Sequence, residues 1–402
     1  MSSISKTLFD PSAVDLTKLG PKNQVEPEFY YYETSARPEI ARVRTLLELW
    51  FASYPLEHQS ELRQRIRASR SGIDSPFWEL LLHRLLTEFG AAVTVHPAVI
   101  GSNRRPDFLV RLHNGFEFYI EAVLATGQTD AERAKENMVS RIYRTIDAKL
   151  LDERFFLSVE VQAFGKVQPP GNKLVYDLAG YLRGLKPEEV GLDLLARGFD
   201  TDYRFEWKHG DWHLEFIPIP RKQESIGKGH RAIGFYPVKV QMSGTKFDIR
   251  SAVEYKLDHH RLLTKPYVIA VNSTHWSTTE EDYIDALYGS ESVVFSMMPD
   301  GSTRRKEERA PDGVWFSERG VRNDRLIGVL GVPDIGGVGP CSVASRSLTL
   351  YENPYIAYPS EATLEPLRRV YPDGVHLGIS PGSSLGEILG LPPTWPTLKE
   401  HD

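Results

Sequence analysis

One stretch of this chain, residues 104–123, constrains its fold more than any other because it places two apolar runs around a turn. The turn is the His-Asn-Gly segment at residues 113–115. Its length decides which side chains of the resulting β-hairpin share a face. A two-residue Asn-Gly loop would place Asp107 opposite Ala122, whereas a three-residue loop with its glycine in the left-handed region places Asp107 opposite Glu121.

Only the three-residue loop separates apolar from polar side chains. One face of the hairpin then carries Phe108, Val110, Leu112, Phe116, Phe118, Ile120 and Ala122. The other face carries Asp107, Leu109, Arg111, Glu117, Tyr119 and Glu121. A slip of one residue would move every side chain to the wrong face, so the segregated register is predicted. Directly opposed side chains have Cβ atoms roughly 4.5–5.5 Å apart. Two carboxylates that close repel unless a positive charge, such as a divalent cation, lies between them.

Length and composition indicate a soluble globular protein of two or three domains. The chain has 402 residues, of which 41% are hydrophobic and 25% are charged. No run approaches the ~20 apolar residues that span a bilayer, and no basic segment followed by an apolar run marks a signal peptide. Cys341 is the only cysteine, which excludes an intrachain disulfide and a multi-cysteine zinc site. We therefore expect a cytoplasmic protein that does not bind membranes.

The charge of the chain is unevenly distributed. The net charge is −6, yet residues 221–265 hold ten Lys or Arg against four acidic residues. Within this block we expect Lys228, Arg231 and Lys239 to contact nucleic-acid phosphates. The alternative interpretation is a solvated face of a helix and its loops. The arginines of residues 56–69 allow the same two interpretations, an exposed face or phosphate contact.

Hydrophobic periodicity and turn residues predict the secondary structure. In the first half we expect an irregular arm at 1–38, helices at 39–53 and 56–69, a largely buried helix begun by Ser75-Pro76 and ended by Gly90, a strand at 92–99, the hairpin at 106–124, a helix from 129 or 130 to about 151 and a strand at 155–164. In the second half we expect helices at 174–182 and 188–198, a hairpin at 205–218 turning at 209–211, a helix at 248–263, a strand at 267–272, a helix capped by Thr279, loops at 290–325 and a strand at 326–332.

The order of elements from 75 to 164 is helix, strand, strand, strand, helix, strand, with Pro106-Asp107 on one strand and Glu121 on the next. This arrangement resembles the core of the PD-(D/E)XK, or restriction-endonuclease-like, nuclease superfamily. The resemblance implies an α/β fold with a mixed sheet. The expected regions are an N-terminal arm with helices at 1–72, a nuclease-like core at 73–165, a basic α/β region at 166–290 and a loop-rich region at 291–402.

The resemblance also implies metal-dependent hydrolysis of phosphodiester bonds. Asp107 and Glu121 would be ligands of Mg²⁺ or Mn²⁺, and the backbone carbonyl of Ala122 would be a further ligand. Glu79 would match an acid that some branches of the superfamily place on the first helix. The alternative for Glu79 is a simple pair with His83, one helical turn away. Asp107 and Glu121 themselves have the alternative of being ordinary structural residues.

The sequence departs from the family pattern at Val123, where the family has a lysine two residues after the glutamate. Arg105 lies opposite Val123 in the predicted register and is expected as a catalytic group, with Lys135 and Lys256 as other candidates. An arginine could hold the phosphate or stabilise the transition state, but it stays protonated and cannot be the base. Without a replacement, the enzyme runs on metal alone or the site is inactive.

The expected function is that of a metal-dependent DNA nuclease, in bacterial defence or DNA processing by family analogy. The first alternative is a catalytically degenerate nuclease fold that binds nucleic acid or protein, and the second is a metal-dependent hydrolase of small phosphoesters. DNA is the expected partner, with a second copy of the chain or a partner protein as alternatives. The glycine-rich segment at 336–339 lacks the spacing of a nucleotide-binding loop and is predicted to be a turn.

Overall fold

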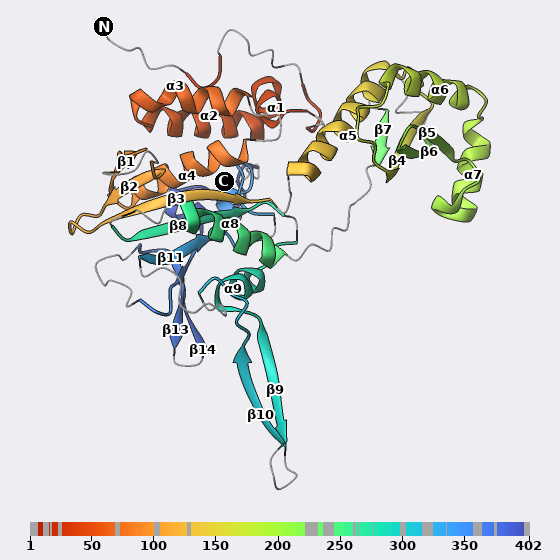
Figure 1. The fold of residues 1–402 in the computed structure, drawn as a ribbon. Coiled ribbons are helices and arrows are strands. Elements are labelled where there is room, and N and C mark those ends of the chain that lie inside the picture. Colours follow the sequence, from red (N-terminus) through yellow and green to blue (C-terminus); the bar gives the residue numbers. More distant parts are fainter. Residues whose placement is uncertain are drawn as a thin grey trace. The chain divides into compact units, whose positions relative to one another are not determined.

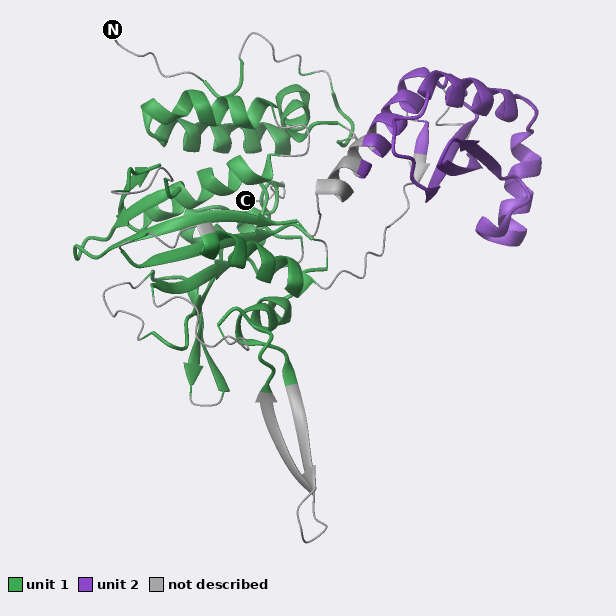
Figure 2. Ribbon diagram, viewed as in Figure 1, with its two compact units in different colours: residues 1–127, 243–402 green, residues 128–242 purple. Residues whose placement is uncertain are grey.

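The computed structural model divides the chain into two compact units, shown as a ribbon in Figure 1 and coloured separately in Figure 2. Unit 1 comprises Met1–Gly127 and Ser243–Asp402, and unit 2 comprises Gln128–Met242. Unit 2 is thus inserted into unit 1 between two of its elements. The structure describes residues 7–10, 16, 18–22, 26–68, 73–99, 105–126, 130–221, 232–235, 245–259, 263, 265–275, 277–297, 303–315, 325–334, 336–356, 364–373 and 376–397.

Unit 1 begins with four helices. They are α1 (Glu28–Thr34), α2 (Pro38–Ser53), α3 (Leu56–Ala68) and α4 (Asp74–Glu88). The helices expected at 39–53 and 56–69 are confirmed, and α4 starts one residue before Ser75. The segment 28–34, expected to be irregular, is helical because its aromatic side chains Phe29, Tyr31 and Tyr32 are buried against the other helices. A helix of seven residues is not stable by itself in water, so α1 depends on this packing for its stability.

The centre of unit 1 is a mixed sheet of eight strands in the order β1-β2-β3-β8-β11-β12-β13-β14. The strands are β1 (Ala92–Val95), β2 (Phe108–Arg111), β3 (Glu117–Ala125), β8 (Tyr267–Ser273), β11 (Leu326–Gly331), β12 (Thr349–Glu352), β13 (Arg368–Asp373) and β14 (His376–Ser380). The first three strands pair antiparallel, whereas β3, β8 and β11 run parallel to one another. All seven residues of β8 are buried, as expected of a strand covered on both faces.

Helices cover both faces of this sheet (Figure 1). On one face, α4 packs on the apolar side of the hairpin and α2 packs on α4, and the indole N–H of Trp78 donates a hydrogen bond of 3.0 Å to the carbonyl of Ala270. On the other face lie α8 (Thr245–His259) and α9 (Glu280–Tyr288), with Ile249, Val253 and Leu257 in the core. Thr279 caps α9 as predicted, in a capping box with Asp282.

The hairpin formed by β2 and β3 has the predicted register. Arg111 pairs with Glu117, and the amide of Leu112 donates to the carbonyl of Phe116 at 2.9 Å. Gly115 has a φ of +87°, the left-handed conformation that the three-residue loop requires. One residue beyond the paired segment, Asp107 faces Glu121, and both side chains are on the face covered by α8.

The expected core at 73–165 is wrong in its second half, which belongs to unit 2 and not to unit 1. The helix and strand predicted to complete it, α5 (Asp130–Lys149) and β4 (Phe155–Ala163), belong to unit 2. There, β4 lies between β6 (Trp212–Pro220) and β7 (Ile233–Phe235) in a separate sheet of order β5-β6-β4-β7, with β5 at Phe205–His209. Alternation identifies a strand but not its partner, because pairing depends on residues far away along the chain. The strand beside β3 is instead β8.

Unit 2 also contains α6 (Gly171–Arg183) and α7 (Pro187–Arg197), which confirm the two helices expected there. The hairpin between β5 and β6 turns at 209–211 as predicted, with His209 opposite Trp212. The boundary expected at 165/166 falls inside this unit, and the basic region expected at 166–290 is divided between the two units.

The region 291–402, predicted to be loop-rich, contains six strands and a short helix, α10 (Leu385–Leu389). Two of the strands, β9 (Glu291–Met297) and β10 (Thr303–Arg309), form a hairpin within residues 290–325, where the sequence predicts loops. The charged run Arg304-Arg305-Lys306 predicts a loop because it lacks the apolar alternation that identifies a half-buried strand. None of the helices among the described residues combines the length and apolar character that a bilayer-spanning segment needs.

Candidate functional site

Asp107 and Glu121 come together at the end of the hairpin because the register places them opposite each other. The side chain of Glu121 is buried, with 2% exposed, and that of Asp107 is 22% exposed. The amide of Ala122 donates to Oδ2 of Asp107 at 2.7 Å, and the amide of His96 donates to the Asp107 carbonyl at 2.9 Å. Asp107 is therefore fixed at both its backbone and its side chain, between the end of β1 and the middle of β3.

Lys256 brings a positive charge to this carboxylate pair. It lies on α8 beside Val253 and Leu257, which anchor that helix on the sheet. Its Nζ atom is 2.7 Å from Oε2 of Glu121 and 3.6 Å from Oδ2 of Asp107. Lysine is thus present beside the two acids, although it comes from a helix 135 residues after Glu121 and not from the position of Val123. Val123 packs in the apolar core beneath α8.

Burial and neighbouring charges shift the pKa values of Asp107 and Lys256. Burial raises the pKa of Asp107 to about 6, with Lys256 opposing this rise and Glu121 adding to it. Burial by itself would lower the pKa of Lys256, but the charges of Asp107 and Glu121 outweigh it, and the pKa is raised. The ammonium group is therefore protonated at neutral pH. It can neutralise and orient neighbouring groups, but in this arrangement it is not a base.

Glu79 on α4 is held in a second polar cluster beside Asp107. Its Oε1 accepts a hydrogen bond of 2.7 Å from the hydroxyl of Tyr54, and its Oε2 is 2.7 Å from a guanidinium nitrogen of Arg65. The imidazole Nε2 of His96 is 3.7 Å from Oε1. The expected alternative, an ion pair between Glu79 and His83, is not found among the described residues. Burial lowers the pKa of His83 to about 4, so that histidine is neutral.

His96 connects the two clusters and has an unusual backbone conformation. Its φ of +46° is the only positive value for a non-glycine residue in the described part of the chain. Its amide holds the Asp107 carbonyl, while its ring approaches Glu79 and stands edge-on to the ring of His58. Residues in such conformations are costly and are retained where surrounding contacts fix them, often at functional sites.

The remaining expected site residues have the following positions. Arg105 is exposed and makes no ion pair with Asp107 or Glu121 in the described part of the chain. Lys135 belongs to unit 2, where its Nζ lies 5.5 Å from the centre of the Phe164 ring. The residues predicted to contact nucleic acid, Lys228, Arg231 and Lys239, lie outside the described residues.

The donors at the hairpin suit a hard divalent cation. In the described ranges, no group of three or more His, Cys, Asp or Glu side chains is placed to hold a metal ion. Magnesium, however, retains several waters and is commonly held by one or two carboxylates. The Lys256 ammonium demonstrates that a single positive charge can approach Asp107 and Glu121 together. The residues present therefore fit Mg²⁺ or Mn²⁺, and Ala122, whose carbonyl is the further expected ligand, directly follows Glu121.

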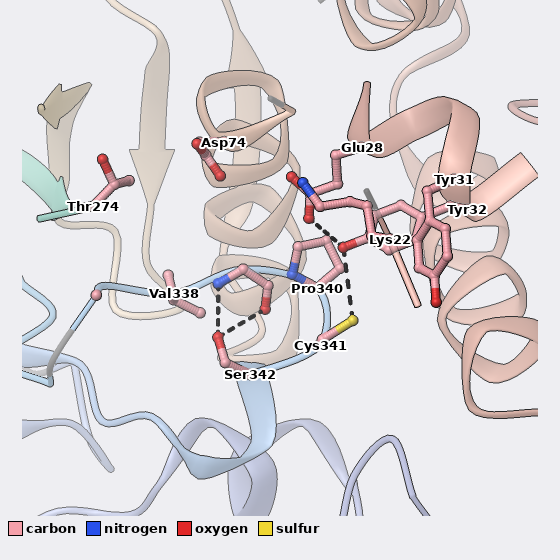
Figure 3. A pocket seen from close by; sticks show the side chains of 12 residues that line it. Lys22, Glu28, Tyr31, Tyr32, Asp74, Thr274, Val338, Pro340, Cys341 and Ser342 are labelled. Atoms are coloured by element: carbon pink, nitrogen blue, oxygen red, sulfur yellow. Dashed lines mark hydrogen bonds between the residues drawn. The ribbon is translucent and has the colours of Figure 1, made fainter. Parts of the chain in front are cut away.

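A separate hollow of about 400 Å³ lies in unit 1 beside the segment after β11 (Figure 3). The hydroxyl of Tyr32 contacts the carboxylate of Glu28 and lies 3.7 Å from Sγ of Cys341. Burial raises the pKa of Asp74 to about 6 and also raises that of the Cys341 thiol. The thiol is therefore protonated at neutral pH, which does not suit a nucleophile.

The glycine-rich segment at 336–339 forms part of this hollow and is a turn, as predicted. The amide of Val338 donates to Oδ1 of Asn272 at 3.0 Å, and the Asn272 side-chain amide donates to the Val338 carbonyl at 3.0 Å. Gly337 has a φ of +64°, and a Cβ atom there would collide with Asn272. The backbone of the segment is hydrogen-bonded to Asn272 at the end of β8. This close approach leaves no room for a side chain at residue 337, which explains the glycine there.

Comparison of the chain with protein-family models, with curated proteins and with solved structures found no match. The geometry at Asp107, Glu121 and Lys256 is therefore what indicates a function for this chain. The sequence indicates the first two as a pair and offers Lys256 only as one of three candidate basic groups, with Arg105 and Lys135. No sequence pattern indicates Tyr54, Arg65 or His96 as partners of Glu79, although Arg65 belongs to the arginine-rich helix predicted at 56–69.

Proposed function

We propose that this chain is a metal-dependent nuclease that hydrolyses phosphodiester bonds in DNA. The observation that carries the proposal is the approach of Lys256 to both Asp107 and Glu121 on facing strands. An acid at the start of one strand, an acid on the next and a nearby lysine are the three groups that the family resemblance requires. The lysine that is missing at Val123 is supplied from α8.

The order of elements in unit 1 supports the same proposal. When the inserted unit 2 is left out, the chain runs α4, β1, β2, β3, α8, β8. This is the helix-strand-strand-strand-helix-strand order of the restriction-endonuclease-like core, with α8 and β8 in the places first assigned to α5 and β4. The parallel pairing of β3 with β8 places α8 over the acidic face of the hairpin.

In the proposed site, Asp107, Glu121 and the Ala122 carbonyl would hold Mg²⁺ or Mn²⁺. When bound, the ion would supply Lewis-acid activation of water and stabilise charge on the scissile phosphate. Lys256 would turn from the carboxylates toward the phosphate oxygens, whose negative charge it can neutralise as an ammonium group. Glu79, held by Tyr54 and Arg65, contributes a negative charge beside Asp107.

One observation favours the alternative of a degenerate nuclease fold that binds nucleic acid or protein without cutting. Lys256 already compensates part of the charge of the two carboxylates, as it would in a fold that had lost its metal. In that case the ammonium is a permanent structural partner, and divalent cations bind no more tightly to the protein than to its carboxylate variants.

Cleavage of plasmid and end-labelled oligonucleotide DNA with Mg²⁺ or Mn²⁺ tests the proposal. Asp107→Asn and Glu121→Gln should each lower the rate more than about 100-fold without unfolding the protein. The matched control is Glu117→Gln, on the same strand and face as Glu121 but paired with Arg111 and Lys265. It should cut normally. Wild-type protein that cuts no DNA with either ion, or Asp107→Asn protein that cuts normally, would overturn the proposal, and the former result would favour the binding module.

A further inference from the structure

Unit 2 contains a cavity of about 500 Å³ between α5 and the start of α6. Its lining residues are Arg141, Arg144, Thr145, Lys149, Gln168, Pro169, Pro170, Gly171 and Asn172. All of them belong to unit 2, so the cavity is formed within that unit alone. The volume falls inside the range of roughly 300–1,000 Å³ that is usual for ligand sites.

Three cationic side chains line this cavity because of their spacing on α5. Arg141, Arg144 and Lys149 stand at positions i, i+3 and i+8, which fall on one face of a helix. Along the helix axis they extend over about 12 Å, at roughly 1.5 Å per residue. Successive phosphates on one strand of duplex DNA advance by only about 3.4 Å along its axis. The three cations therefore extend far enough to contact several successive phosphates, and over a greater length than a single phosphate group occupies.

The cations are available to a ligand. Arg141 and Arg144 are exposed, and neither guanidinium has an acidic partner within the part of the chain that the structure describes. Lys149 is held against the opposite wall by a hydrogen bond of 2.6 Å from its Nζ to Oδ1 of Asn172. The nearby acid Asp147 points elsewhere, since its Oδ1 accepts from the amides of Ala232 and Ile233.

The wall formed by residues 169–172 adds to the positive potential. There the helix α6 begins, and no side chain caps its N-terminus. The first amides of a helix carry partial positive charge and favour an anion. None of the nine lining residues is acidic, and none is aromatic, so the cavity offers no surface on which a base could stack. Its chemistry suits phosphate and sugar without recognition of the base.

From this arrangement we propose that the cavity of unit 2 binds the phosphate backbone of a nucleic acid, without preference for sequence. The proposal deepens the proposed function and rests on it for the identity of the nucleic acid as DNA. The binding itself does not depend on the cleavage site, since all the groups that carry it belong to α5 and to the start of α6.

Binding is measured by fluorescence anisotropy of a short labelled DNA duplex with the full chain in EDTA, at a series of KCl concentrations. Arg141→Ala/Arg144→Ala should weaken binding more than about tenfold at low salt. It should lower the slope of log affinity against log salt by about two, and each single variant should lower it by about one. The charge-matched control is Lys186→Ala/Lys208→Ala, two exposed lysines of unit 2 that pair with Glu189 and Glu206. It should change affinity less than about twofold.

An unchanged affinity and slope in the arginine variant, or an equal loss in the control, would overturn the inference. Inorganic phosphate, adenosine monophosphate and polyglutamate are tested as competitors. Competition equal to that of unlabelled DNA by any of them would overturn the assignment to a nucleic-acid backbone. If wild-type protein binds the duplex and the arginine variant loses this affinity, while wild-type protein fails to cut DNA, the proposed function fails and the inference about unit 2 stands.

Discussion

At the scale of single residues, the site is defined by how three charges share a buried position. Glu121 and Lys256 are closer than Asp107 and Lys256, and all three side chains are mostly covered. A buried ion pair adds little compared with apolar packing, but the loss of one partner leaves an uncompensated charge. The effect of Lys256 on the free energy of unfolding should therefore be measured by removing its charge.

We predict that Lys256→Met destabilises the protein by roughly 3–5 kcal/mol at neutral pH, because two carboxylates then face each other without a cation. The matched control is Lys265→Met, which breaks a pair of the same 2.7 Å length with Glu117 at a more exposed position. It should cost less than about 1 kcal/mol. Both values come from denaturant unfolding. Equal losses for the two variants would contradict the prediction.

The pKa of Asp107 gives a second prediction. That pKa is about 6 in the folded protein against an ordinary value of 3.8, so the native state holds more protons than the unfolded chain between these values. Stability should therefore fall as pH rises through this window. A divalent cation binds the deprotonated carboxylate, so Mn²⁺ affinity should rise about tenfold per pH unit below pH 6 and level off above it.

Isothermal titration with Mn²⁺ in buffers of different ionisation enthalpy measures this effect, and about one proton should be released per ion below pH 6. In Asp107→Asn protein, the pH dependence should disappear together with most of the affinity. A wild-type affinity that does not change between acid and neutral pH would show that Asp107 is not a ligand.

At the scale of elements, the hairpin of β2 and β3 holds the acids in place through its turn. Gly115 has a φ of +87°, and open space surrounds the position that a Cβ atom would take. A side chain there meets no steric obstacle, so any cost of substitution comes from the left-handed backbone alone. The turn fixes the register, and the register places Asp107 opposite Glu121.

We predict that Gly115→Ala lowers the free energy of unfolding by about 1–2 kcal/mol, since an L-residue pays this much in the left-handed region. The control is Gly20→Ala in the same unit, which also has open space around the Cβ position but no positive φ. Its effect should stay within about 0.5 kcal/mol. Chemical denaturation of the two variants measures the difference in the free energy of unfolding. Equal losses in the two variants would show that the left-handed conformation of Gly115 does not cause the destabilisation.

At the scale of the whole molecule, the chain consists of one unit inserted into another. Both apolar clusters that surround the large sheet draw all their residues from unit 1. Unit 2 has its own sheet and its own buried side chains, among them Ile146, Leu157 and Phe216. Each unit therefore contains the core that it needs.

We predict that replacing residues 128–242 by a flexible linker leaves unit 1 folded, with Mn²⁺ binding at Asp107 and Glu121 unchanged within about twofold. DNA affinity should fall at least as much as in the Arg141→Ala/Arg144→Ala variant, because the cavity of unit 2 is removed. Circular dichroism, thermal unfolding and metal titration of the shortened chain measure these outcomes. An insoluble or unfolded product would show that unit 1 requires contacts from the insertion.

Local sequence was sufficient for some features of this protein. Alternation and the turn at 113–115 determined the hairpin register, and with it the facing positions of Asp107 and Glu121. Hydrophobic periodicity predicts buried helices and strands such as α4 and β8, and the structure contains both. The sequence also predicts the cap at Thr279, which the structure confirms. These features depend on residues a few positions apart, whose geometry is nearly independent of the rest of the chain.

Tertiary structure alone decided which strand lies beside β3 and which lysine approaches Asp107 and Glu121. The sequence suggested the next strand in order, β4, but β8 takes that place because residues 128–242 close on themselves as a unit. Lys256 reaches Glu121 across 135 residues. Strand partners and charge pairs of this separation are selected by packing of the whole core, and no local pattern encodes them.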